Sequence, residues 1–212
     1  MNLNRIFDPQ NKFWSFMEKI MNLCVLSLFW LVFSLPVVTA GASTAALFNY
    51  TLKLAREEEG YVWKTFFRGF KSNFVQATVL WIGMAVLGAF LVFDLYCCQF
   101  LPFSALKWAA RVVLISLMLI ALLTSLYLLP MIAFFRTTIK RAVIHSFVMA
   151  MGNLYVSVTI LVIYAAAAAA VYFIPVLFMV WFTLASYVAS HLFNHVFLKY
   201  MEDVNNIDNN PA

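Results

Sequence analysis

Four long stretches of this chain contain no Asp, Glu, Lys or Arg, and they limit its possible folds more than any other feature. They cover residues 20–52, 72–93, 112–135 and 142–198 and are 33, 22, 24 and 57 residues long. Since an α-helix rises about 1.5 Å per residue, roughly 20 apolar residues cross the ~30 Å hydrocarbon core of a bilayer. Each stretch is long enough to span once, and the last is long enough to span twice.

Composition supports a membrane protein, because only 11% of the residues are charged where soluble domains have about 25%. We therefore predict an all-α fold, a multi-pass transmembrane helical bundle. Pro175 lacks an amide donor and divides the last stretch. The five predicted spans are about 20–40, 74–94, 111–132, 153–173 and 177–198.

The same pattern predicts the domain organisation. Residues 1–19 form an amphipathic N-terminal segment, 20–198 a single membrane domain, and 199–212 a polar C-terminal tail. An alternative interpretation takes the first apolar stretch as a cleaved export signal. Asp8 and Glu18 argue against it, as does the length of that stretch, since the apolar part of such signals has about 7–15 residues.

Basic residues predict the orientation, because short loops rich in Lys and Arg stay on the cytoplasmic side. With five spans, the first and third loops and the C-terminus contain nine Lys and Arg, against five on the opposite side. This predicts an external N-terminus and a cytoplasmic C-terminus. Each half of the chain also reads helix, Leu-Pro, basic connector, Phe, Asn, helix, which indicates an internal repeat with both connectors on one face. The alternative is that Leu-Pro helix ends and Asn caps are common.

The first connector contains an amphipathic segment. Apolar side chains at positions 62, 66, 67 and 70 share one helical face, and Lys64, Arg68 and Lys71 lie opposite. We expect an interfacial helix whose cations meet anionic headgroups, each contributing about 1 kcal/mol; docking on a cytoplasmic partner is the alternative. The candidate partner- or lipid-facing residues are Lys64, Phe66, Phe67, Arg68, Phe70, Lys71, Arg136, Lys140 and Arg141.

Small residues indicate helix packing within the membrane. Ala165 to Ala170 form an unbroken run, and Ala185/Ala189 with Ser186/Ser190 repeat a small-xxx-small spacing. Small side chains let helix backbones approach closely. We expect Ala165, Ala169, Ala185, Ala189, Ser186 and Ser190 to pack the fourth span against the fifth; the alternative is an external face for another membrane protein or a second copy.

Several motifs resemble a known family. They are Phe29-Trp30, Leu35 to Gly41 followed by Ala45-Ala46-Leu47, and Phe70-Lys71 with Asn73-Phe74. The chain resembles the YesL-like family of bacterial integral membrane proteins, a domain of unknown function, although Ala42 stands where that family usually has proline. The resemblance implies a multi-pass protein of Gram-positive bacteria, often encoded near carbohydrate-uptake and polysaccharide-degradation systems. It transfers no catalytic residues.

Residues that carry chemistry are scarce. His191 and His195 have the i, i+4 spacing of two metal ligands, but the sequence indicates no third ligand beyond His145, Glu202 or Asp203. Cys97-Cys98 and Cys24 lack CxxC spacing. No phosphate loop, nucleophile elbow or paired-carboxylate arrangement occurs. We expect no enzyme, no cofactor, no metal and no nucleic-acid partner.

These observations lead to three functional hypotheses. We expect an integral protein of the bacterial cytoplasmic membrane that serves as an accessory component of a membrane assembly linked to carbohydrate uptake, with the lipid bilayer and a membrane transport complex as partners. The first alternative is a small transporter or permease-like subunit for an uncharged solute, since the cores of the predicted spans contain no Asp, Glu, Lys or Arg and Asp94 lies at a span end. The second is a lipid-interacting, membrane-shaping protein.

Overall fold

The structure is a computed structural model that describes residues 12–58, 60–100, 104–135, 137–173 and 179–209, and no strand occurs among them. Its elements are α1 (Lys12–Ser34), the 3₁₀ turn η2 (Val37–Thr39), α2 (Ala40–Ala55), α3 (Val62–Cys97), the 3₁₀ turn η3 (Cys98–Phe100), α4 (Ser104–Phe134), α5 (Ile139–Gly152), α6 (Leu154–Phe173) and α7 (Trp181–Asn209). The all-helical prediction is confirmed for these residues.

Helix α2 lies at the centre of the fold and contacts α1, α3, α4 and α7. Every residue from Gly41 to Phe48 is buried. The buried hydroxyls are hydrogen-bonded, with Thr44 accepting from the Trp30 indole at 3.1 Å and Thr51 accepting from Ser190 at 2.8 Å. With 16 residues, α2 is about 24 Å long at 1.5 Å per residue. Surrounding helices rather than lipid cover this short helix, which the sequence pattern predicted as part of a connector.

A glycine allows α2 to approach α3 closely. A methyl group at Gly41 would overlap Cβ of Trp81 and lie 2.7 Å from the carbonyl oxygen of Ala77. The Trp81 indole also donates a hydrogen bond to the carbonyl of Val37 at 3.0 Å. The Leu35-to-Gly41 motif is therefore the turn that folds α2 back against α1 and α3.

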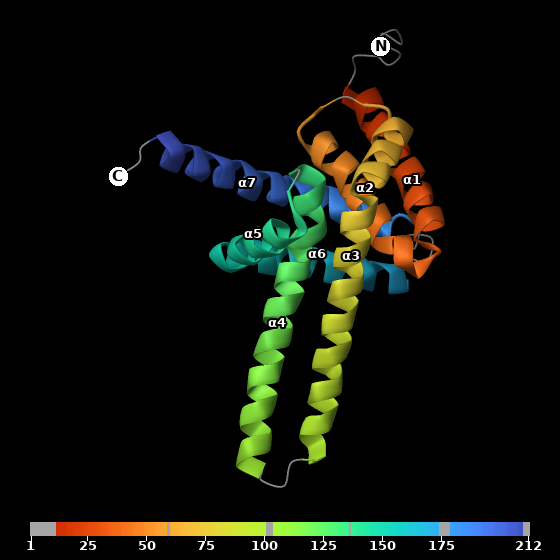
Figure 1. The fold of residues 1–212 in the computed structure, drawn as a ribbon. Helices are drawn as coiled ribbons and strands as arrows, with labels where there is room; N and C mark the ends of the chain where they lie inside the picture. Colours follow the sequence, from red (N-terminus) through yellow and green to blue (C-terminus); the bar gives the residue numbers. More distant parts are fainter. Residues whose placement is uncertain (1–11, 59, 101–103, 136, 174–178, 210–212) are drawn as a thin grey trace.

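Helices α3 and α4 form a long antiparallel hairpin that extends beyond the other helices (Figure 1). With 36 and 31 residues, they are about 54 and 46 Å long at 1.5 Å per residue. Large apolar side chains remain exposed along the hairpin, among them Phe90 at 59%, Phe93 at 63% and Val112 at 60%. Exposed apolar surface of this extent marks contact with a membrane or a partner.

The amphipathic segment at 62–71 is the beginning of α3 rather than a separate helix. Phe66 is completely buried, and its ring packs against Phe29 and Phe33 of α1. The apolar face that was expected to meet lipid here meets α1 and α2. The sequence pattern identified an amphipathic face but could not show that another helix covers it.

Four helices are long and apolar enough to cross a membrane, at Phe16–Ser34, Val62–Phe100, Leu106–Phe134 and Leu154–Phe173. These helices contain most of the first predicted span and nearly all of the next three. The first helix ends at Ser34 rather than at residue 40 because the chain turns at Pro36. The fifth, 177–198, falls mainly on α7, which is not among the four; residues 174–178, with the predicted turn at Pro175, lie outside the described residues. Helices α6 and α7 run across the hairpin in the view of Figure 1.

The small residues that were predicted to pack the fourth span against the fifth differ in burial between α7 and α6. Ala185, Ser186, Ala189 and Ser190 are all buried, against α2 through Thr51 and against α6 through Tyr164. In contrast, Ala165 and Ala169 are exposed. The small residues of α7 therefore pack against both α2 and α6.

Candidate functional site

A cleft of about 900 Å³ opens where α2 ends, α3 begins and α4 passes into α5. We call it the basic cleft. Its lining residues are Asn49, Leu52, Lys53, Arg56, Arg68, Lys71, Ser72, Asn73, Val75, Gln76, Ile132, Ala133, Phe134, Thr137, Thr138 and Arg141.

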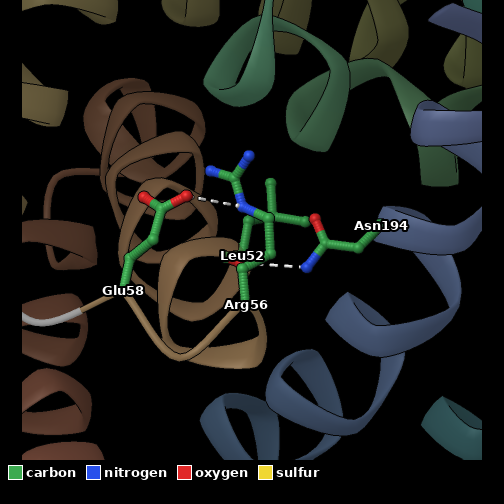
Figure 2. A network of polar contacts seen from close by, with 4 residues as sticks. All are labelled: Leu52, Arg56, Glu58 and Asn194. Carbon is green, nitrogen blue, oxygen red and sulfur yellow. Dashed lines mark hydrogen bonds and ion pairs between the residues drawn. The ribbon is translucent and has the colours of Figure 1, made fainter.

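The lining contains five cations and no carboxylate. Arg56 forms an ion pair with Glu58, Nε to Oε1 at 3.2 Å (Figure 2), and its guanidinium lies over the Phe134 ring at 4.8 Å. The other four cations form no ion pair with any residue that the structure describes. Because four of the five cations gather there without an ion-pair partner among the described residues, the cleft is a region of positive potential.

Backbone hydrogen bonds fix the end of α2, which provides Lys53 and Arg56 to one wall of the cleft. Glu57, at φ 58°, lies in the left-handed region, its amide donates to the carbonyl of Leu54, and the amide of Glu58 donates to Lys53. This is a Schellman motif, which glycine usually completes. The amide of Arg56 donates to Lys53 rather than to Leu52.

Helix α7 satisfies the carbonyl of Leu52 that this turn leaves without its α-helical partner. The side-chain amide of Asn194, which is 5% exposed, donates to it at 2.9 Å (Figure 2). A buried carbonyl without a donor is costly, so this bond stabilises the end of α2 against α7.

Two more side-chain amides hold the opposite wall. Asn49 of α2 donates to the carbonyl of Ala133 at 3.2 Å, and Gln76 of α3 donates to the carbonyl of Thr137 at 3.1 Å. Both carbonyls belong to the region where α4 ends and α5 begins. The three walls are thereby fixed relative to one another by polar contacts.

This arrangement is suited to binding an anion. Guanidinium groups bind phosphate or carboxylate in a bidentate manner, and an ammonium group adds a point charge. Amide and hydroxyl groups from Asn73, Ser72 and Thr138 line the same space. The lining has no His, Cys or carboxylate, so it contains none of the commonest groups for general acid–base chemistry.

The structure brings together three of the predicted site residues, Arg68, Lys71 and Arg141, all exposed at the cleft. Lys64 lies outside it, above the rings of Tyr61 and Trp63 at 5.0 and 5.7 Å, and Lys140 is exposed outside the lining. Phe66 is buried, Phe70 partly buried and Phe67 exposed; Arg136 lies outside the described residues.

Sequence reasoning missed Lys53, Arg56, Asn49 and Gln76. A helical spacing was available as a signal, because positions 49, 53 and 56 recur at i, i+4 and i+7 on one face of α2. The spacing alone does not show where the walls opposite this face of α2 lie.

The histidines and cysteines lie apart from the cleft. His191 and His195 are exposed on α7, and the Tyr200 hydroxyl lies 2.6 Å from Nδ1 of His145. Cys24, Cys97 and Cys98 are free thiols. Within the described ranges, no three His, Cys, Asp or Glu side chains group closely enough to hold a metal ion.

A family model described as "Protein of unknown function, DUF624" matches residues 23–95. The match runs from α1 to near the end of α3 and includes four of the five cleft cations, but not Arg141. No curated protein and no solved structure matches the chain. The resemblance to the YesL-like family stays a prediction.

Proposed function

We propose that this chain is an integral protein of the bacterial cytoplasmic membrane that works by binding rather than catalysis, as an accessory component of a membrane assembly. In this proposal the basic cleft faces the cytoplasm and holds an anionic group. The observation that carries it is the gathering of five cations and no carboxylate in one cleft beside the apolar α3–α4 hairpin.

The distribution of charge supports this orientation. Lys19 borders a pocket with Glu57, Glu58 and Gly60, so the first half of α1 lies at the cleft end of the molecule. Among the cations on α1 to α5 and their links whose side chains the structure describes, eight gather at that end: Lys19, Lys53, Arg56, Lys64, Arg68, Lys71, Lys140 and Arg141. Two others, Lys107 and Arg111, lie near the far end of the hairpin. Since Lys and Arg favour the cytoplasmic side, the cleft end is cytoplasmic. In this proposal the start of α1 lies inside, in contrast to the external N-terminus that the count over five spans predicts.

A charge-matched pair of variants tests the cleft. Replacing Arg68, Lys71 and Arg141 by Gln removes three cleft cations, and replacing Lys64, Lys107 and Lys140 by Gln removes the same charge elsewhere. We expect inorganic phosphate to raise the Tm of the detergent-solubilised wild type and of the control, because a ligand that binds only the folded state stabilises it. The cleft variant should lose that shift; equal shifts in all three proteins would contradict the proposal.

Co-purification addresses the assembly. We expect a stoichiometric membrane partner in mild detergent, and the carbohydrate link predicts a transport complex. Solute flux in vesicles that contain only this chain would instead support the transporter hypothesis.

A further inference from the structure

An apolar groove continues from the basic cleft along the same three helices. Its volume is about 730 Å³. Its lining residues are Val79, Leu80, Gly83, Met84, Leu87, Leu91, Leu117, Ile120, Ala121, Thr124, Ser125, Leu128, Ile139, Val143, Ile144 and Phe147. The two hydroxyls among them donate within α4, from Thr124 to Ile120 and from Ser125 to Leu122, so the groove is apolar throughout.

The cleft and the groove follow one another in register. On α3 the cleft ends at Gln76 and the groove begins at Val79, one turn further on. On α5, Arg141 lines the cleft, and Ile139 and Val143 on either side of it line the groove. The combined surface therefore has a cationic end and a long apolar end.

The two parts lie at the depths of the headgroup layer and of the hydrocarbon core. Residues 72–93 of α3 contain no charge, a length of about 33 Å that matches the ~30 Å hydrocarbon core. Arg68 and Lys71 then lie at the headgroup layer. The groove extends along α3 from Val79 to Leu91, about 18 Å at 1.5 Å per residue, and so lies beside the acyl chains.

We propose that the basic cleft and the apolar groove together bind one anionic phospholipid. Its phosphate lies among Arg68, Lys71 and Arg141, and its acyl chains lie in the groove between α3, α4 and α5. This inference rests on the proposed function and names the source of the anionic group. Soluble phosphate or an acidic peptide would use the cleft and leave the groove empty, whereas a lipid uses both.

Two glycines on α3 offer a matched test of the groove. No atom lies within 4 Å of a methyl group placed at Gly83 or at Gly88, so the first carbon of a larger side chain meets no neighbour at either position. Gly83 lines the groove and Gly88 does not. Gly83→Leu therefore occupies groove space, and Gly88→Leu adds the same side chain to the same helix outside it.

The experiment measures lipid retention by native mass spectrometry of the full chain, purified in nonionic detergent and mixed with equal amounts of phosphatidylglycerol and phosphatidylcholine. We expect the wild type to retain phosphatidylglycerol preferentially. Each single substitution R68Q, K71Q or R141Q should weaken its binding about fivefold, the change that corresponds to about 1 kcal/mol per basic residue at an anionic lipid surface. Gly83→Leu should weaken the binding of phosphatidylglycerol more than Gly88→Leu does.

The outcomes separate the lipid from the other anions. Equal retention of the two lipids, or equal effects of Gly83→Leu and Gly88→Leu, would overturn the lipid inference. If inorganic phosphate still shifted the Tm through the cleft, the proposed function would stand. If neither phosphatidylglycerol nor phosphate bound, both would fall. A phosphatidylglycerol preference that the R68Q/K71Q/R141Q protein keeps would also contradict the assigned site.

Discussion

Helix α3 has glycines in two kinds of surroundings, and the contrast shows which part of the helix packs closely against another helix and which part does not. Near the cleft, a methyl group at Gly69 would lie 3.0 Å from Cβ of Asn49 and 3.3 Å from Cα of Ala46. Further along the hairpin, Gly83 and Gly88 have nothing within 4 Å. The first half of α3 is thus closely packed on α2, and the second half has open space at its glycines.

Gly41→Ala should produce the largest effect, because α3 leaves no room for a Cβ at Gly41. Its new methyl group would lie 2.7 Å from the backbone oxygen of Ala77, which cannot move without shifting α3. We expect a loss of about 1–3 kcal/mol, the usual cost of overpacking. Thermal unfolding in detergent measures it, with Gly88→Ala as the control; equal Tm values for the two variants would refute the close packing.

Asn194→Ala should have the next largest effect. It removes the donor to the buried carbonyl of Leu52 and so loosens the wall that holds Lys53 and Arg56. We expect a loss of about 1–2 kcal/mol in stability. The neighbouring exposed position provides the control, since His195→Ala should change stability by less than about 0.5 kcal/mol. A harmless Asn194→Ala would mean that α7 does not brace the cleft.

The pair Gly69→Ala and Gly83→Ala sharpens the comparison within one helix. At Gly69 the neighbours must give way by a few tenths of an ångström, and we expect a loss of about 1 kcal/mol. At Gly83 the better helix propensity of alanine should give a gain of up to about 1 kcal/mol. Tm shifts of opposite sign are expected; shifts of the same sign would remove the distinction between the two halves.

Glu57→Gly should have the smallest effect, a gain of about 0.5–1 kcal/mol. Glu57 has φ 58° in the Schellman motif, where a side chain strains the backbone and glycine does not. Glu57→Ala retains Cβ and serves as the control that should show no gain. Unfolding midpoints of the three proteins measure the difference, and a stabilised Glu57→Ala would point to charge rather than backbone strain.

Much of the helical framework was predictable, because charge-free length identifies apolar helices without knowledge of their neighbours. The four predicted stretches around 20–40, 74–94, 111–132 and 153–173 correspond to helices long and apolar enough to span. The cations Arg68, Lys71 and Arg141 were also identified as candidates, although their meeting in one cleft depends on the fold.

The central role of α2 was not predictable from local pattern. Its sequence is rich in small residues and includes Ser43, Thr44 and Thr51, a pattern typical of a connector rather than of a membrane span. The burial of α2 depends on side chains of α1 and α7 that form hydrogen bonds with its hydroxyl groups. For the same reason, the apolar face around Phe66 could be predicted from spacing, but its cover by α1 could not.

Cysteine accessibility in intact cells tests the central claim most directly, namely that the basic cleft lies on the cytoplasmic side of a membrane-crossing hairpin. In a variant whose three native cysteines are replaced by Ala, single cysteines are introduced at Lys71, in the cleft, and at Gln99, exposed just beyond the far end of α3. We predict that an impermeant thiol reagent labels Gln99→Cys in intact cells and labels Lys71→Cys only after permeabilisation. Labelling of Lys71→Cys in intact cells, with Gln99→Cys protected, would contradict the account.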